Sequence, residues 1–447
     1  MQAIWEQQRL KRGELKTIDG QPVRILHPGW LNRAAGPDFQ EAVIQFSGQE
    51  PQMGDIEVDV ESNGWHAHKH DTNPNYQNVI LHVVWEKSQT SSPLPTLALS
   101  EFLDSPMADL QHWLANDSRE TLPQSLQGQC SAPLKLLDEA VWRDLLGQAS
   151  LIRLQAKAAH IEARARQVGW EQSLIEMLFR ALGYKQNVWP MQRIGEMTPH
   201  IMEAMNGERC ASSLQAILLG VSSLLPEEVR DPRHSVDAYV RHLWEIWWHR
   251  RHSLHEHILP RQVWRFNGIR PANHPQRRLA LAAHWLAKKD LAIRLEEWLS
   301  QKVRKTHLVP SLLEIMQEDK DEFWSRRWTL KAARMTQEQP LLGETRLTDI
   351  AINVVLPWLW LRAAKGENSQ LLEEVETRYL TWPRAEDNSV LRQARRRLLG
   401  HSTPSILTTA AEQQGLIQIV RDFCDHADST CANCPFPALI NGVTAAK

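Results

Sequence analysis

Three acidic residues alternate with aliphatic residues in the segment 54–60 (GDIEVDV). Asp55, Glu57 and Asp59 are two positions apart, and a β-strand repeats its side-chain direction every two residues. We therefore expect a strand with three carboxylates on one face and three aliphatic side chains on the other. Like charges on one face repel each other unless a cation lies among them. The pattern thus indicates a divalent-metal site, or else the solvated edge of an antiparallel sheet.

A fourth acidic residue, Asp38, follows Pro37 at the start of another alternating run, residues 39–46 (FQEAVIQF). A turn between the two predicted strands would form a hairpin and bring Asp38 beside Glu57 and Asp59. Carboxylate oxygens are hard ligands that suit Mg²⁺ or Mn²⁺. We expect Asp38, Glu57 and Asp59 to bind one of these ions and to take part in catalysis.

Histidines follow closely in the segment 65–71 (WHAHKHD), which contains His66, His68 and His70. Turn-forming residues close this segment, so we expect a loop. Neutral imidazoles bind transition metals and can also transfer protons near a scissile bond. We take His68 and His70 as candidate catalytic residues, although an exposed loop with incidental histidines is the alternative.

A further histidine, His82, lies in the apolar run 79–85 (VILHVVW), which predicts a central strand. A single histidine in such a run is more often a hydrogen-bonded core residue than a ligand. If this strand pairs with the strand that carries Glu57, however, His82 reaches the same site. We therefore include it among the candidate metal ligands.

Three of the five cysteines lie near the end of the chain as Cys424, Cys431 and Cys434, spaced C-x6-C-x2-C. Thiols gathered in this way in a cytoplasmic protein indicate a metal site rather than disulfides. The spacing resembles the first three ligands of the iron–sulfur loop of DNA glycosylases, whose fourth cysteine corresponds here to Ile440. An iron–sulfur cluster and a structural Zn²⁺ site are both open. The candidates for a fourth ligand within the chain are Cys130, Cys210 and His426.

The elements that must position these residues change in character along the chain. Strand-like alternation ends at a turn-rich stretch, residues 88–95 (SQTSSPLP), and from about residue 131 apolar residues recur at helical spacing. We predict an α+β protein with a mixed α/β domain at residues 1–125. A large all-α domain at residues 126–447 follows and ends in the cysteine cluster.

Basic residues precede one of the predicted helices as Arg270, Arg277 and Arg278. Because a helix N-terminus favours phosphate, these arginines are candidates for nucleic-acid contact. The alternative is a solvated face or pairing with acidic helices.

Length and composition are those of an ordinary globular protein. The chain has 447 residues, a length that is enough for two or three domains. Its formal net charge is -2, and 23% of its residues are charged. The overall charge is only weak evidence against nucleic-acid binding, because a protein with a balanced total charge can still have a basic face. We see neither an apolar run of 18 residues nor a signal-peptide pattern, so we expect a cytoplasmic protein without a membrane partner.

Several separated motifs of the chain resemble a bacterial family catalogued as domain of unknown function 2851. They include GPDF, GDIEVDV, NVILHVV, GWEQSLIEMLFRALGYKQN, GIRPANHPQRRLA and QGLIQIVRDFC. The resemblance runs essentially from end to end. It does not imply a function.

The N-terminal part resembles the PD-(D/E)xK nuclease superfamily, in which an aspartate after a proline and an acidic-x-lysine pair on the next strand bind metal. The resemblance implies a restriction-endonuclease-like sheet with Asp38, Glu57 and Asp59 as ligands and Glu6 as an additional ligand from a preceding helix. Asp59 departs from the pattern, since it replaces the lysine. In some of these nucleases, three C-terminal cysteines and one cysteine distant in the sequence together bind an iron–sulfur cluster. This resemblance makes Cys130 a candidate for the distant ligand.

We therefore expect a divalent-metal-dependent nuclease or phosphodiesterase whose helical domain positions DNA or RNA. Two other readings remain open. One is a non-catalytic binding or scaffold protein on a degenerate nuclease fold, and the other is a transition-metal enzyme that uses the histidines and Glu57.

Overall fold

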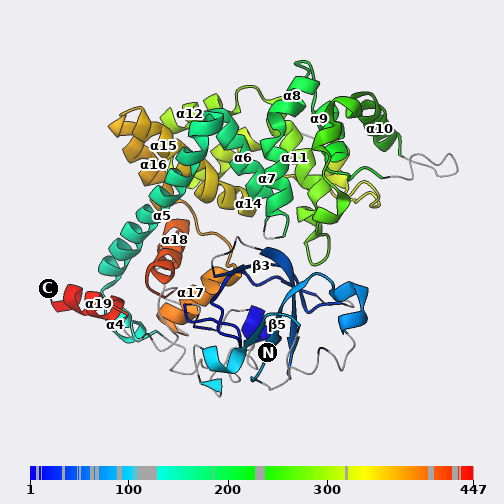
Figure 1. Cartoon of the computed structure of the whole chain (residues 1–447). Helices are drawn as coiled ribbons and strands as arrows, with labels where there is room; N and C mark the ends of the chain where they lie inside the picture. The colour runs from blue at the N-terminus through cyan, green and yellow to red at the C-terminus, as the bar shows by residue number, and fades with distance from the viewer. Residues whose placement is uncertain are drawn as a thin grey trace. The chain divides into compact units, whose positions relative to one another are not determined.

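The structure is a computed structural model, shown in Figure 1. It describes residues 1–6, 10–11, 13–32, 36–47, 49, 52–60, 65, 70–87, 93–103, 106–107, 128–184, 186–226, 237–317, 321–400, 407–424, 431 and 434–445. The predicted domain boundary at residue 125 lies outside these described residues.

Contacts divide the chain into two compact units. Unit 1 comprises Met1–Trp142, Ser389–Pro404 and Ile419–Lys447, and unit 2 comprises Arg143–Asn388 and Ser405–Gln418. The C-terminal segments therefore belong to the same unit as the N-terminal strands. The cysteines near the end of the chain lie in unit 1, not in the helical unit.

Unit 1 is built on a mixed sheet, so the predicted combination of an N-terminal sheet with a mostly helical remainder is confirmed. The described strands run in the order β1-β3-β4-β5-β6, with β2 paired to β3. Pairing is antiparallel among β1, β2, β3 and β4, and parallel from β4 to β5 and from β5 to β6. The strands are β1 (Val23–His27), β2 (Trp30–Leu31), β3 (Phe39–Phe46), β4 (Gln52–Asp59), β5 (Val79–Val84) and β6 (Thr96–Ala98).

The acidic strand β4 lies inside this sheet, between β3 and β5. Its aliphatic residue Ile56 is fully buried in a core that also contains Phe39 and Leu81. Glu57 and Asp59 are buried as well. The alternative of a solvated sheet edge is therefore wrong for these two carboxylates, because they lie on an interior strand and are shielded from solvent.

The short helix α1 (Gln2–Glu6) contributes to the same core. Ile4 and Trp5 are fully buried, and the Trp5 indole donates to the carbonyl of Pro28 at 2.8 Å. The other helices of unit 1 among the described residues are α4 (Ser131–Lys135), α17 (Ser389–Leu399) and α19 (Phe436–Ala445), and both α17 and α19 contact α4.

Unit 2 is helical, as the apolar periodicity predicts, and helix α5 runs into it from unit 1. Its principal core holds most of the large buried tryptophans, which fill the space between helices rather than an exposed face. The helices are α5 (Glu139–Val168), α6 (Trp170–Leu182), α7 (Val188–Glu196), α8 (Thr198–Ala204), α9 (Ala211–Val221), α10 (Ala238–Arg250), α11 (Pro275–Ala287), α12 (Leu291–Ser300), α13 (Leu308–Met316), α14 (Glu344–Ile350), α15 (Leu356–Lys365), α16 (Ser369–Thr381) and α18 (Ala410–Ile419).

Shorter helical segments connect these elements. The 3-10 turns are η1 (His70–Thr72), η2 (Pro74–Tyr76), η3 (Leu99–Phe102), η6 (Arg251–His257), η7 (Arg261–Val263), η8 (Pro271–Asn273), η9 (Lys305–His307) and η10 (Trp324–Arg326), and π-helical turns occur at η11 (Ala351–Val355) and η12 (Val420–Cys424). The π-helical turn η11 joins α14 and α15 into one helical run, Glu344–Lys365. This run is long and apolar enough to cross a membrane, but 72% of its most apolar stretch is buried within the protein, as in a core helix.

Candidate metal centre

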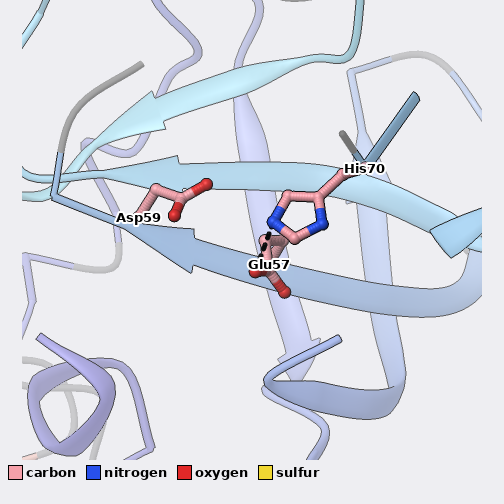
Figure 2. A group of neighbouring side chains, drawn as sticks. All are labelled: Glu57, Asp59 and His70. Carbon is pink, nitrogen blue, oxygen red and sulfur yellow. Dashed lines mark ion pairs between the residues drawn. The ribbon is translucent and has the colours of Figure 1, made fainter. Parts of the chain in front are cut away.

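Two carboxylates and one imidazole converge on one point of the sheet in unit 1 (Figure 2). Glu57 and Asp59 come from β4, and His70 comes from the 3-10 turn η1. One ligand atom from each lies within 4.8 Å of the other two, and no other part of the described chain has such a group. The three residues are 7%, 8% and 8% exposed. This is a compact and buried donor set.

The aspartate that precedes β3 lies directly beside this group. The backbone amide of Asp38 donates to Oε2 of Glu57 at 3.1 Å, and Oδ2 of Asp38 accepts from the amide of Val58 at 3.2 Å. The antiparallel pairing of β3 with β4 causes this approach, which is the proximity expected from the hairpin. Asp38 is not a member of the 4.8 Å group, so it borders that group rather than completing it.

Helix α1 does reach this site, through a residue that the sequence did not single out. The side-chain amide of Gln2 donates to Oδ1 of Asp38 at 2.7 Å. We expected Glu6 from this helix, but its side chain lies outside the part of the chain that the structure describes. The sequence could indicate that an amphipathic helix contributes to the site. Which of its side chains reaches the site depends on how the helix docks.

The third acidic residue of the alternating run serves a different purpose. Oδ1 of Asp55 accepts from the backbone amide of Glu41 at 3.0 Å. Glu41 has a positive φ of 58° and lies in a β-bulge of β3, between Phe39 and Ala42. Asp55 therefore stabilises this irregular backbone, and it is not a member of the 4.8 Å group.

His82 lies on the neighbouring parallel strand and contacts the site through Asp59. It is fully buried, and its Nε2 is 3.0 Å from Oδ2 of Asp59. The pairing that we expected between its strand and the strand of Glu57 is present, with Glu57 opposite His82 in register. His82 is not part of the 4.8 Å group, so its position suits orienting Asp59 rather than binding an ion itself.

Aromatic side chains cover the imidazoles. The ring of His70 stacks on Tyr76 with a centroid distance of 3.9 Å, and Trp65 lies 5.4 Å from His70 and 5.7 Å from His82. No pattern in the sequence indicates that Trp65 and Tyr76 lie here. They make the surroundings apolar, which strengthens electrostatic interactions in the site.

Burial has a large effect on the acid groups. It raises the pKa of the Glu57 carboxyl from its ordinary value of 4.5 to about 8, and the charges of Asp38 and Asp59 add to the rise. Burial also raises the pKa of Asp38, although hydrogen bonds from Val58 and Gln2 oppose the shift. The pKa of Tyr76 is raised by burial and by the charges of the same three carboxylates. The carboxyls of Glu57 and Asp38 therefore do not ionise easily without a cation nearby.

This donor set fits a divalent cation. Carboxylates suit Mg²⁺ and Mn²⁺, while imidazole suits transition metals. Two buried nitrogens at the border of the site, Nδ1 of His82 and Nε1 of Trp65, have no hydrogen-bond partner among the described residues. His66 and His68 lie outside those residues.

The structure corrects the expected role of two arginines. Arg277 is fully buried and Arg278 is 3% exposed, on helix α11 of unit 2. The Arg277 guanidinium donates to backbone carbonyls, for example to that of Gln339 at 2.7 Å, and Arg278 donates to the carbonyl of Leu341 at 2.7 Å. Buried donors that are already paired with carbonyls cannot contact a nucleic acid in this conformation. Arg270 is exposed, and its contact with a nucleic acid stays a prediction.

Comparison with known proteins gives a family but no function. No curated protein and no solved structure matches the chain. A family model described as "Protein of unknown function (DUF2851)" matches residues 1–389, which include the whole candidate metal centre. This match covers most of the sequence, and the chain therefore belongs to that family.

Proposed function

We propose that this protein is a divalent-metal-dependent nuclease or phosphodiesterase that acts on DNA or RNA. The observation that carries the proposal is the buried group of Glu57, Asp59 and His70, with Asp38 hydrogen-bonded to its edge. Buried carboxylates that face each other are costly unless a cation compensates them. A metal ion is therefore the simplest reason for their arrangement.

The surrounding elements support a restriction-endonuclease-like sheet. In the nuclease pattern, an aspartate after a proline precedes one strand and an acidic pair lies on the next. Here Asp38 follows Pro37 before β3, Glu57 and Asp59 lie on β4, and these two strands pair in the sheet. The short helix α1 supplies a side chain to the same site through Gln2.

The donor set favours Mn²⁺ over Mg²⁺. Mg²⁺ prefers oxygen ligands and binds imidazole poorly, whereas Mn²⁺ accepts carboxylates and is a transition-metal ion. His70 Nε2 lies 3.3 Å from Oε1 of Glu57, so the imidazole is available on the same side as the carboxylates. We propose Mn²⁺ as the better activator.

Each side chain has a distinct task in this proposal. When bound, the ion polarises a phosphate oxygen and generates a nucleophilic hydroxide from water. Glu57 and Asp59 supply ligand oxygens, and His82 holds the Asp59 carboxylate in place. The nuclease pattern has a lysine where this chain has Asp59, and because His70 supplies a ligand nitrogen here, a bound ion would itself lower the pKa of water at the site. Trp65 and Tyr76 limit the access of water to the imidazole.

The presence of His70 in the group favours one alternative, a transition-metal hydrolase that acts on a substrate other than nucleic acid. A non-catalytic scaffold has less support, because a protein without chemistry gains nothing from keeping two carboxylates buried.

A cleavage assay tests the proposal. Single-stranded and duplex DNA, RNA and a small phosphodiester are incubated with the full-length protein and Mn²⁺, Mg²⁺ or Zn²⁺. We expect cleavage with Mn²⁺, and a loss of at least about tenfold in Glu57→Gln and Asp59→Asn. Glu14→Gln is the matched control, because Glu14 is an exposed acid of the same unit. The nuclease assignment fails if wild type cleaves none of these substrates, and activity with Zn²⁺ on the small ester alone favours the hydrolase.

A further inference from the structure

Four of the five cysteines gather in unit 1, away from the carboxylates of the candidate metal centre. Cys130 precedes helix α4, Cys424 ends the π-helical turn η12, and Cys431 and Cys434 precede helix α19. We call these four residues the thiol cluster. All are free thiols, and Cys130 and Cys431 are buried. The backbone amide of Cys434 donates to the carbonyl of Cys431 at 3.1 Å, which holds these two residues in one turn.

A glycine turn brings the two buried sulfurs together. A Cβ atom on Gly128 would lie 3.0 Å from Sγ of Cys130 and 3.7 Å from Sγ of Cys431, so both sulfurs border the same small space. The amide of Gly128 donates to the carbonyl of Arg397 at 2.8 Å. This bond joins the Gly128 turn to helix α17, and it holds Cys130 where Cys431 can approach.

The distance between ligand sulfur atoms distinguishes a zinc site from an iron–sulfur cluster. A zinc ion binds each thiolate at about 2.3 Å, which places tetrahedral sulfur ligands roughly 3.8 Å apart. In the described residues, however, no three Sγ atoms of the cluster lie within 4.8 Å of one another. A four-iron cluster gives each thiolate an iron of its own, so its ligand sulfurs lie farther apart. The wider arrangement suits iron and sulfide better than zinc.

The Arg397 side chain contacts the sulfur of Cys431 in the way expected beside an iron–sulfur cluster. Nη2 of Arg397 donates to Sγ of Cys431 at 3.0 Å. Hydrogen bonds and positive charge near ligand sulfurs stabilise iron–sulfur clusters and tune their reduction potentials. Arg397 is one of three consecutive arginines on α17. Its contact with Cys431 gives this basic run a role at the thiol cluster.

We propose that Cys130, Cys424, Cys431 and Cys434 bind one [4Fe–4S] cluster. The cluster fastens the C-terminal segment and helix α19 to the Gly128 turn and helix α4, elements that come from distant parts of the sequence. Figure 1 shows α19 beside α4. Three of the four ligands lie beyond residue 389, where the family match ends, so the match does not assign this site.

Metal analysis of the full-length protein tests the proposal directly. After anaerobic purification we expect about four iron atoms and about four acid-labile sulfides per chain, with broad visible absorbance that bleaches on reduction with dithionite. One zinc ion per chain without sulfide would overturn the cluster, and protein that remains free of metal after reconstitution with iron and sulfide would do the same.

Substitutions identify the ligands. Cys130→Ser and Cys434→Ser should each lose more than half of the bound iron, and Cys210→Ser, in which the one exposed cysteine outside the cluster is changed, should retain it. Circular dichroism of each variant separates loss of the cluster from loss of the fold. Full iron content in Cys130→Ser would remove Cys130 from the site. Glu57→Gln should keep the cluster, so failure of the nuclease proposal would leave this one standing.

Discussion

Nε2 of His82 lies 3.0 Å from Oδ2 of Asp59, and the two residues belong to neighbouring parallel strands at the centre of the sheet. His82 is fully buried, so the contact is shielded from solvent. A histidine fixed in this way selects one orientation of the carboxylate. It turns Asp59 toward Glu57 and His70, and it thereby links the sheet pairing to the geometry of the candidate metal centre.

This link predicts an effect of His82 on metal affinity without direct binding. We expect His82→Ala to weaken Mn²⁺ binding by about 10- to 100-fold, because the carboxylate of Asp59 loses its orienting partner. His82→Gln should recover part of the affinity, since its amide nitrogen can donate to the same oxygen. Isothermal titration calorimetry of the purified variants measures both values.

Unit 2 offers a matched control for His82. His284 is also a buried histidine, with Nε2 at 2.8 Å from Oδ2 of Asp321. His284→Ala should destabilise the protein to a similar degree but leave Mn²⁺ affinity unchanged. Equal losses of affinity in the two alanine variants would mean that His82 acts only through overall stability.

The raised pKa of Glu57 predicts that metal affinity depends on pH. Below its pKa of about 8 the carboxyl is mostly protonated, and an ion must displace that proton to bind. We therefore expect Mn²⁺ affinity to rise with pH up to about 8 and binding near neutral pH to release close to one proton. Calorimetry in buffers of different ionisation enthalpy counts the proton. Affinity that does not change between about pH 6 and about pH 8 would contradict this prediction.

The same shift predicts that the metal-free protein loses stability as pH rises. The folded-state pKa of Glu57 is above its ordinary value of 4.5, so the folded protein binds the proton more tightly than the unfolded chain does. Stability is therefore highest below the ordinary pKa and is lost as pH rises to about 8, by on the order of 2–4 kcal/mol.

Chemical denaturation across this pH range measures the loss. Glu57→Gln should be more stable than wild type at neutral pH in the presence of a chelator, because its side chain stays neutral. Glu14→Gln should follow the wild-type curve. A Glu57→Gln variant with a lower free energy of unfolding than wild type at neutral pH would show that the ionised carboxylate is favourable in the folded protein.

The buried arginines of α11 predict a stability effect rather than a binding effect. Arg277→Ala should lower the free energy of unfolding by about 3 kcal/mol, because buried carbonyls such as that of Gln339 lose a charged donor. Arg270→Ala is the control, and it should change stability by less than about 0.5 kcal/mol because Arg270 is exposed. Denaturant titration compares the two variants. A negligible effect of Arg277→Ala would show that its hydrogen bonds are dispensable.

The contact between Arg397 and Cys431 predicts a change of reduction potential, if the thiol cluster holds iron and sulfide as proposed. Arg397→Met removes a positive charge and an N–H donor from the sulfur, so the more negative reduced cluster becomes less favourable. The potential should fall, as measured by dye-mediated titration. Arg396→Met, at an exposed position of the same helix, should leave it unchanged. A higher potential in Arg397→Met would contradict this role of the arginine.

Local patterns in the sequence determined much of unit 1. The two-residue alternation located β3 and β4, and their short connection predicted that Asp38 approaches Glu57. The apolar run around His82 predicted a central strand. These inferences succeeded because strand formation and hairpin pairing depend on residues that are close together in the chain.

Other features were decided only by tertiary structure. Residues 60–78 separate β4 from β5, and residues 7–37 separate α1 from Asp38, and contacts across such distances cannot be derived from periodicity. The parallel pairing of β4 with β5 brings His82 to Asp59, and the docking of α1 brings Gln2 to Asp38. The bulge in β3 likewise gives Asp55 a partner that periodicity does not reveal, the backbone amide of Glu41.

The arginines and cysteines show the same division. The sequence shows the positive charge of the arginines and predicts metal binding by the cysteines, but the burial of a residue depends on which side of a helix meets the core. Helix α11 lies in the interior of unit 2. Arg277 and Arg278 therefore donate to buried backbone carbonyls and do not lie on the surface, where they could bind phosphate. The sequence alone predicted a metal site at the C-terminal thiols. Only the folded chain brings the Gly128 turn, and Cys130 with it, to Cys431 of the C-terminal segment.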